Sequence, residues 1–332
     1  MKKRQTQTDA VNTVEIQKYK DYSLFSRYGI VSLVALFVLV FSLASPAFMT
    51  ARNWSSLIVG QVAVACIALG AICPMIAGEF DFSVGYAIGL LAIIGATVAQ
   101  RTSSAVVVIA AVLLSGMLIG LVNGVIAIML HINSTVVTLG MGLVYYGINM
   151  AISDGRTITG NIPPILSAVA KTKVLNFNIS VWIIVLMALV LWYLMEHTPF
   201  GKQLYAVGLC ERAAHLSGVR TRLLKIIAFV ICDVCIAFGA LFLLGQSGSA
   251  APNTGPSYQL SAYAVCFLSI TTHKAGKFNI PGLMLSILML AIGFNGLSLL
   301  GGPFWMESVF NGIILIVAIL TTKSDARTVI IG

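Results

Sequence analysis

Charged residues are almost absent from long parts of this sequence, and this absence limits the possible folds more than any other feature. No Asp, Glu, Lys or Arg occurs in residues 53–78, 102–153, 234–273 or 278–306. Charged residues make up 9% of the 332 residues and hydrophobic residues 58%, whereas soluble domains average about 25% charged residues. A transmembrane helix needs about 20 mostly apolar residues. The sequence therefore predicts a polytopic helical membrane protein and excludes an ordinary soluble domain.

Hydrophobic windows interrupted by Gly, Pro and charged residues predict about ten transmembrane helices. The expected fold class is all-α, a polytopic membrane protein with two inverted five-helix halves. The predicted spans are residues 29–45, 56–77, 82–99, 105–130, 134–152, 178–195, 224–244, 258–272, 279–299 and 304–322.

The distribution of Lys and Arg predicts the orientation of these spans. With the N-terminus inside, five of the 20 basic residues fall in outer segments and the other 15 in inner ones, as expected for cytoplasmic retention of positive charge. Both termini are then cytoplasmic, with tails at residues 1–28 and 323–332, and the first span is uncleaved. The plasma membrane is the expected location. The net charge of +9 follows from this topology, so no nucleic-acid partner is needed to explain it.

A polar segment at residues 153–177 divides the predicted transmembrane domain, residues 29–322, into halves of about 29–152 and 178–322. Each half has an odd number of spans, so any repeat that relates the halves must be inverted. Many transporters have this design, with the pathway at the interface between the repeats.

Two carboxylates lie in the sequence GEFDFSVG, residues 78–85. Asp81 is placed to N-cap a helix that begins at Phe82. Glu79 and Asp81 then belong either to a capped surface turn or to a hinge or gate beside a transport pathway.

A third carboxylate, Asp233, falls near the middle of the predicted span 224–244. At bilayer depth a charged side chain costs at least about 2.5–3.5 kcal/mol, so Asp233 should face a partner or a hydrated cavity. The alternative is a shifted span, with Asp233 near an edge and paired with Lys225 or Arg222.

Polar uncharged residues mark the interior faces of other spans. Tyr145 and Asn149 are four residues apart and share one helix face, and hydroxyl and amide groups in a cavity suit a polyol. Hydrogen bonding between helices explains each residue separately. The pathway or gate candidates are Glu79, Asp81, Ser83, Asn123, Asn149, Asp233 and Asn295.

The longest inner loop, residues 196–223, is too apolar for a plain linker. It predicts a short helix, a break at Gly208, a second short helix over about residues 211–217, and a stop at Gly218. Such a helix could transmit movement from a cytoplasmic motor. The alternative is an amphipathic helix that rests on the membrane interface.

Three stretches carry a family resemblance: GEFDFSVG (78–85), TPFGKQLYAVGLCERAAHLSGV (198–219), and residues 251–301 from APNTG to NGLSLLG. They are similar to motifs of the permease subunits of ribose-type ATP-binding-cassette (ABC) importers, which include ribose, arabinose and xylose permeases. Phe82, Lys202 and Cys210 stand where that family usually has Leu, Arg and Asn.

The resemblance implies import of a monosaccharide or related polyol, driven by ATP hydrolysis in a separate subunit. It also implies a second permease subunit, a cytoplasmic ABC ATPase and an extracytoplasmic sugar-binding protein as partners, besides the lipid bilayer. The residues that it implies for coupling to the ATPase are Gly201, Lys202, Ala206, Gly208, Glu211, Ala213, Ala214 and Gly218.

Cofactor motifs are missing from the sequence. No G-x-x-x-x-G-K-[ST] phosphate loop occurs, so ATP and Mg²⁺ are expected on the partner ATPase and no enzyme activity on this chain. Cys232 and Cys235 form a C-x-x-C without a second pair or a nearby His, so no metal site is predicted.

Five basic residues in the predicted outer segments are candidates for docking an acidic binding protein, although they can also be ordinary solvated charges. They are Arg52, Arg101, Arg156, Lys171 and Lys173.

Two other classes of protein stay open. A proton- or ion-coupled secondary transporter would use Asp233, Glu79 and Asp81, but it leaves the loop 196–223 without a role. A membrane-embedded enzyme is the third class, and no span carries the paired His and carboxylate or the nucleophile and base that it would need.

Overall fold

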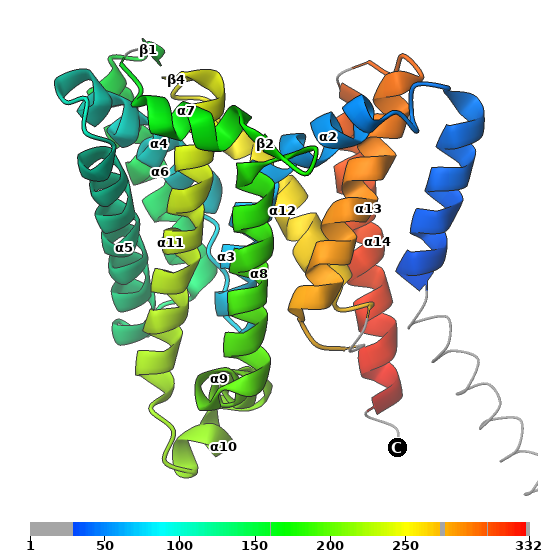
Figure 1. Cartoon of the computed structure of the whole chain (residues 1–332). Coiled ribbons are helices and arrows are strands. Elements are labelled where there is room, and N and C mark those ends of the chain that lie inside the picture. The colour runs from blue at the N-terminus through cyan, green and yellow to red at the C-terminus, as the bar shows by residue number, and fades with distance from the viewer. Residues whose placement is uncertain (1–28, 160, 273–275, 304, 330–332) are drawn as a thin grey trace, which may run out of the picture.

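The chain folds almost entirely into helices (Figure 1). The computed structural model describes residues 29–159, 161–272, 276–303 and 305–329, with side chains up to residue 319. The predicted tail 1–28 lies outside these residues. After a first helix, Gly29–Ala44, the helices are α2 (Ala51–Gly60), α3 (Val62–Ile76), α4 (Val84–Arg101), α5 (Ala105–Met129), α6 (Ser134–Ser153), α7 (Pro164–Lys171), α8 (Ile179–His197), α9 (Pro199–Leu209), α10 (Glu211–Leu216), α11 (Thr221–Ser247), α12 (Pro256–Ser269), α13 (Ile280–Leu299) and α14 (Trp305–Val329).

Several of these helices can cross a membrane. Six in the described part of the chain are long and apolar enough alone, and α2 with α3, which meet at a bend of 43°, would make a seventh. Helix 29–44 and the apolar part of α14, Trp305–Ile319, are shorter. The all-α polytopic class is therefore confirmed. Each of the ten predicted ranges overlaps a helix, while the count of ten spans and the two inverted halves stay predictions.

Helix α11 is the centre of the larger group of helices and packs most extensively against α5 and α3. Three glycines of α5, four residues apart, face it: Gly116, Gly120 and Gly124. A Cβ at Gly120 would collide with the carbonyl oxygen of Phe229 on α11. Small residues at this spacing let the two backbones approach closely, and van der Waals contact then stabilises the pair without a hydrophobic driving force.

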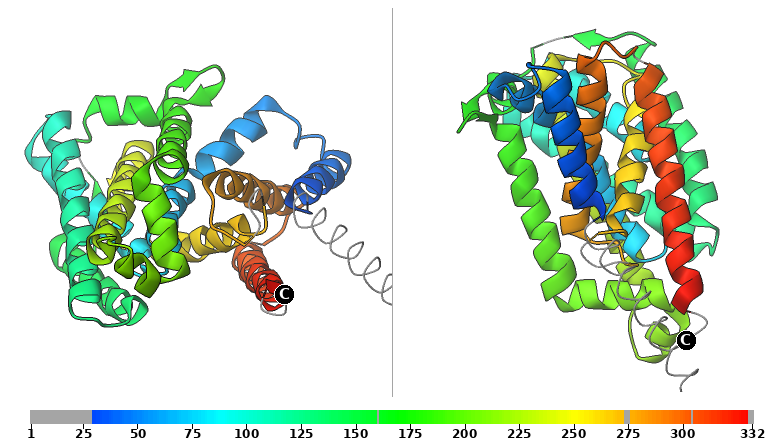
Figure 2. Two further views of the ribbon diagram at one scale, coloured as in Figure 1. Left: turned by 90° about the horizontal axis from the view of Figure 1, so that it is seen from below. Right: turned by 90° about the vertical axis from the view of Figure 1, so that its right-hand side faces the viewer.

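A second group consists of α12, α13, α14 and helix 29–44. These helices pack around smaller apolar clusters that include Phe41, Phe48 and Met289. Figures 1 and 2 show α2 passing from this group toward the first one. α12 contacts both α14 and α3, so it joins the two groups.

The two ends of the molecule differ (Figure 1). One end carries α7 and two short antiparallel pairs: β1 (Ile158–Thr159) with β4 (Ser249–Ala250), and β2 (Lys173–Val174) with β3 (Phe177–Asn178). The opposite end carries α9 and α10 together with the last described turn of α14. Since α14 continues to Val329, residues 323–329 of the predicted C-terminal tail are helical.

Candidate coupling and translocation site

The chain between α3 and α4 is not helical, although helices flank it on both sides. Helix α3 ends in a Schellman turn, in which Gly78 N–H donates to Met75 O at 3.1 Å and Glu79 N–H to Pro74 O at 2.9 Å. Gly78 has φ +82°, a conformation that favours glycine. We call residues 78–83 the break segment.

Side chains of α6 satisfy the backbone of the break segment. Phe80 N–H donates to the hydroxyl of Ser134 at 3.1 Å, and Phe82 N–H donates to the hydroxyl of Thr138 at 2.9 Å. From α12, the Tyr263 hydroxyl donates to the carbonyl of Asp81. Irregular backbone is tolerated at membrane depth where protein groups replace the missing helical hydrogen bonds, so α6 and α12 together hold the break in place.

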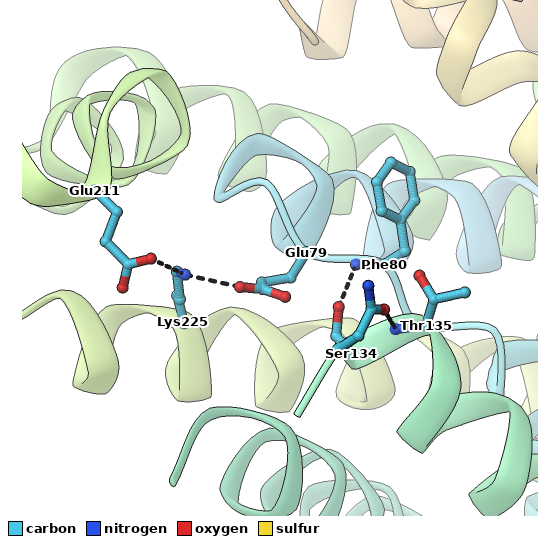
Figure 3. A network of polar contacts seen from close by, with 7 residues as sticks. Glu79, Phe80, Ser134, Thr135, Glu211 and Lys225 are labelled. Atoms are coloured by element: carbon cyan, nitrogen blue, oxygen red, sulfur yellow. Dashed lines mark hydrogen bonds and ion pairs between the residues drawn. The ribbon is translucent and has the colours of Figure 1, made fainter. Parts of the chain in front are cut away.

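Lys225 of α11 connects the break segment to α10. Its Nζ lies 2.7 Å from Glu79 Oε1 and 2.7 Å from Glu211 Oε2. The Lys225 side chain is 8% exposed, against 17% for Glu79 and 49% for Glu211. Figure 3 shows Lys225 between the two carboxylates. One ammonium group therefore joins a break between membrane helices to a helix of the loop 196–223.

Glu211 is the exposed member of this network, on the short helix outside the membrane-spanning segments. The hydrogen bond from Lys225 holds the pKa of the Glu211 carboxyl below its ordinary value, although partial burial acts in the opposite direction. The ionised form is thus the one that the network stabilises.

A cavity of about 1220 Å³ lies beside the Glu79–Lys225–Glu211 network. The break segment, the turn between α5 and α6, α10 and the start of α11 line it. Arg222 Nη2 lies 2.9 Å from His131 Nε2 across this region. Arg222 and Lys225 both have other partners, so the predicted alternative in which one of them pairs with Asp233 is wrong.

A buried polar cluster follows Glu79 along the chain. Asp81 Oδ1 accepts hydrogen bonds from the Ser83 hydroxyl at 2.6 Å and the Ser83 N–H at 2.9 Å, and Oδ2 accepts from Asn123 Nδ2 at 3.2 Å. The Tyr145 hydroxyl donates to Asn123 Oδ1 at 2.7 Å. Asp81, Ser83 and Asn123 are each 0% exposed, so three of the predicted pathway candidates lie together in the protein interior.

The structure corrects the predicted cap of the next helix. Helix α4 begins at Val84 with Ser83 at the N-cap position, rather than at Phe82. Asp81 instead accepts the N–H of Ser83, the residue directly before the first helical residue of α4.

Asp233 is buried in α11 with 0% exposure, and neither carboxylate oxygen has a hydrogen-bond partner in the described part of the chain. The prediction that Asp233 lies near the middle of its helix is confirmed, and the shifted span is wrong. The partner expected for its carboxylate is not found among the described residues. Two other candidates lie elsewhere: Asn149 donates to Pro252 O at 3.0 Å, and Asn295 exchanges hydrogen bonds with Asn53 of α2. Tyr145 and Asn149 are both buried on α6, as expected for one shared face.

The predicted helix pair of the loop 196–223 is present as α9 and α10, but the break falls at Cys210 and not at Gly208. Gly208 is helical and touches the end of α3, where a Cβ would collide with the carbonyl oxygen of Ile76. Tertiary packing therefore explains this glycine, since only a residue without a side chain allows that approach. Gly218 ends α10 with φ +84°, as predicted.

The other coupling candidates lie on or beside these two helices. Lys202, Ala206 and Ala213 are exposed, whereas Gly201 and Ala214 are buried. A Cβ at Gly201 would collide with the carbonyl oxygen of Met195, at the end of α8. Apolar side chains are exposed here too, with Leu209 at 72% and Leu216 at 81%.

The five predicted docking residues are all exposed. They lie on α2, at the end of α4, near β1, and on α7 and β2, so most of them sit at the end of the molecule that carries α7 (Figure 1). Arg156 lies 3.9 Å from Asp154, and both side chains are more than four-fifths exposed. A pair so exposed is weak.

Sequence reasoning missed several members of this site. The sequence suggests Lys225 only as an alternative partner for Asp233, and it assigns no role to Ser134, Thr138 or Tyr263. The available signal for Lys225 is its position within the apolar sequence LLKIIAF, residues 223–229, because a lysine there needs a carboxylate partner or an aqueous path.

Comparisons with known proteins define the class of this chain. Residues 54–319 match the family described as "Branched-chain amino acid transport system / permease component", and the chain belongs to that family. No solved structure matches the chain significantly.

Curated relatives cover most of the chain. It is 29% identical over 294 residues to the ribose import permease protein RbsC of Escherichia coli (strain K12), covering 87% of this chain and 92% of that protein. It is 29% identical over 317 residues to the galactose/methyl galactoside import permease protein MglC of Salmonella typhimurium, covering 90% and 94%. It is 28% identical over 299 residues to the L-arabinose ABC transporter permease protein AraH of Azospirillum brasilense, covering 90% and 88%.

Proposed function

We propose that this chain is the membrane-spanning permease subunit of an ABC importer, which moves a monosaccharide or related polyol into the cell. ATP hydrolysis in a separate subunit drives the movement. The relatives named above are permeases for ribose, galactose and arabinose, which supports a sugar over a branched-chain amino acid as the substrate. The observation that carries the mechanism is the position of Lys225 between Glu79 and Glu211.

The α9–α10 pair is the surface that docks with the ATPase. It exposes Leu209 and Leu216 at an end of the molecule that also carries the last turn of α14. Exposed leucines on a polar-flanked loop favour a protein partner, which would cover them on docking. In this arrangement α10 moves with the ATPase, and Lys225 transmits the movement to the break segment.

The break segment then carries the movement into the membrane domain. Glu79 is bonded to Lys225, and two residues later Asp81 is bonded to Ser83 and Asn123. A displacement of α10 therefore acts through contiguous polar contacts on the break segment, which leads into α4, and on Asn123 of α5.

The remaining parts of the proposal concern topology and partners. Ten spans in two inverted halves place both termini and α9–α10 in the cytoplasm of a bacterial cell, with the permease in the inner membrane. A second permease subunit completes the pathway. The opposite face, with its exposed basic residues, receives an extracytoplasmic sugar-binding protein with acidic patches.

The direct test is reconstitution of the chain with its ATPase in liposomes, with ATP inside and the loaded binding protein outside. We expect ATP-dependent uptake of a sugar from a panel of D-ribose, D-galactose and L-arabinose. Uptake driven by a proton gradient without the ATPase would overturn the proposal in favour of a secondary transporter.

Docking through α10 is tested with a matched pair of variants. Leu216→Asp should abolish co-purification with the ATPase, because it places a charge in the docking surface. Leu175→Asp is the control: Leu175 is 77% exposed on the turn between β2 and β3, at the other end of the molecule. Equal effects of the two substitutions would contradict docking at α10.

A further inference from the structure

A groove with aromatic walls lies between the break segment, α4, α6, α12 and α14. Its volume is about 660 Å³, in the range of pockets that bind small molecules in proteins. Aromatic residues from the break segment, α4 and α12 make up much of its lining: Phe80, Phe82, Tyr86, Tyr263 and Phe267.

The rings of this groove form a nearly continuous apolar surface. Phe82 and Tyr263 have ring centroids 4.8 Å apart with planes inclined by 23°, and Phe80 and Phe267 are 6.0 Å apart with planes inclined by 22°. Phe80 and Phe82 are 6.3 Å apart at 27°. Phe82 therefore stacks one ring face on Tyr263, and Phe267 stacks one ring face on Phe80, so two stacked pairs make up the aromatic wall of the groove.

Three polar groups lie among these rings. The amide of Gln259 and the hydroxyls of Tyr86 and Thr135 line the groove, and none of them hydrogen bonds to another residue in the part of the chain that the structure describes. A lipid chain would leave these groups without partners, which is costly in hydrocarbon. A polar ligand with an apolar face would satisfy them.

We propose that this groove is a sugar-contacting site, in which the C–H face of a monosaccharide ring packs against Phe82 and Phe267 while its hydroxyls hydrogen bond with Gln259, Tyr86 and Thr135. The inference rests on the proposed function and names the surface that the substrate touches. Monosaccharides have this combination of one apolar ring face and a polar edge, and aromatic side chains offer a large rigid apolar surface with specific geometry.

The groove is mechanically connected to the ATPase-docking surface. Phe80 and Phe82 flank Asp81 in the break segment, whose first carboxylate, Glu79, is bonded to Lys225. Figure 3 shows the Phe80 ring and the Glu79 carboxylate pointing in different directions from adjacent residues. When the ion-pair network moves Glu79, the rings of Phe80 and Phe82 therefore move as well. This movement would change the contact between the aromatic side chains and the sugar during the transport cycle.

The experiment measures the number of sugar molecules imported per ATP hydrolysed by the complete reconstituted complex. Wild type is first assayed with D-ribose, D-galactose and L-arabinose to find a transported sugar. In Phe82→Leu/Phe267→Leu, which keeps the groove apolar but removes two ring faces, we expect this ratio to fall about three- to tenfold. Phe82→Tyr/Phe267→Tyr, which keeps the rings, should stay near wild type.

Phe37→Leu is the matched control. Phe37 is half-buried and packs on Phe310 with centroids 6.4 Å apart, outside the groove. A similar fall in sugar imported per ATP in Phe37→Leu would overturn the sugar site, and so would an unchanged value in the double Leu variant. In either case, uptake by the wild-type complex would still support the proposed function. A wild-type complex that imports none of the three sugars would overturn the proposed function and this inference together.

A second copy of the chain is the competing occupant of the groove. Leu260 lines the groove and is 43% exposed, so Leu260→Cys in a Cys210→Ser background places one accessible thiol there, since the other cysteines are buried. A disulfide between two copies that leaves uptake unchanged would assign the groove to subunit packing and overturn the sugar site. The sugar site would be supported if sugar-loaded binding protein slows the chemical modification of this thiol.

Discussion

Lys225 Nζ lies 2.7 Å from Glu211 Oε2 and the same distance from Glu79 Oε1, so a single lysine of α11 bonds at once to the loop helix α10 and to the break between α3 and α4. The lysine is the least exposed of the three side chains. Removal of either carboxylate leaves the other bond in place, whereas removal of the lysine disconnects both. Lys225 is therefore the side chain that joins the two regions in this network.

Replacement of Lys225 should separate ATP hydrolysis from transport. In Lys225→Met the carboxylates of Glu79 and Glu211 lose their shared donor, and we expect a loss of about 1–3 kcal/mol of stability together with a fall in stimulation of the ATPase by loaded binding protein. Thermal unfolding in detergent and ATPase assays of the complex measure these effects.

The control for this prediction is Lys202→Met. Lys202 is exposed on α9 and forms no ion pair among the described residues, so its replacement should leave the unfolding temperature unchanged. Equal unfolding temperatures for the two variants would show that the Lys225 network does not stabilise the fold.

The contribution of Glu211 should depend on pH in a definite direction. The hydrogen bond from Lys225 lowers the folded-state pKa of Glu211 below its ordinary value of 4.5. The stabilisation is therefore complete above the ordinary pKa and is lost as pH falls through the lower folded-state value. The difference in unfolding temperature between wild type and Glu211→Gln should shrink as the pH is lowered from about 6 to about 3. A difference that grows on acidification would contradict the assignment.

Gly208→Ala should weaken the packing of α9 on α3. In a helix this substitution usually gains about 0.5–1 kcal/mol, but here the new Cβ collides with the carbonyl oxygen of Ile76, and overpacking costs about 1–3 kcal/mol. Gly147→Ala on α6 is the matched control, because its Cβ would meet no atom within 4 Å. Thermal unfolding should give a lower unfolding temperature for Gly208→Ala than for Gly147→Ala. A higher unfolding temperature for Gly208→Ala than for wild type would show that the contact between Gly208 and Ile76 can relax.

The sequence predicted the helices well wherever a long segment is apolar and free of charge. The expected span 105–130 is α5, Ala105–Met129, and the span 134–152 is α6, Ser134–Ser153. In these segments the helix is required by the hydrogen-bonding needs of the backbone in a membrane, so hydrophobicity alone is enough to locate them.

Local patterns could not predict interactions between distant residues. Lys225 and Glu79 are 146 positions apart, and no spacing rule relates them. The position of the loop break was also wrong, because glycine has a poor helix propensity and Gly208 was expected to end a helix. Its close contact with Ile76 overrides that propensity. The stripe Gly116, Gly120 and Gly124 could have been detected, since its four-residue spacing is a sequence signal for close helix packing.

The exposed basic face should steer the binding protein. Neutralising Arg101, Arg156 and Lys171 as a triple Gln variant should lower the association rate of the binding protein at low salt, because attraction between exposed charges accelerates encounter. Raising the ionic strength should reduce the difference, as screening acts over about 8–10 Å near physiological salt. Stopped-flow binding over a series of salt concentrations measures this difference in association rate. An association rate that does not change with salt concentration would contradict electrostatic docking.

Two buried acids of the membrane domain should respond differently to the same substitution. Asp81 accepts three hydrogen bonds, from the Ser83 N–H, the Ser83 hydroxyl and Asn123 Nδ2. In Asp81→Asn one acceptor oxygen becomes an amide donor that faces other donors, so we expect a loss of about 1–3 kcal/mol and defective ATP-driven uptake. Asp233 has no such partner for either oxygen in the described part of the chain, so Asp233→Asn should keep both stability and uptake.

The same pair of variants separates the ABC importer from the secondary transporter. A proton-coupled carrier needs a titratable group in the membrane domain, and Asp233 is the natural candidate because it is buried in α11 and has no partner among the described residues. If ATP-driven uptake survives Asp233→Asn with an unchanged pH profile, Asp233 carries no coupling proton and the driving force enters through α10. Loss of uptake in Asp233→Asn, with normal assembly and normal ATPase stimulation, would instead place a proton step in the transport cycle.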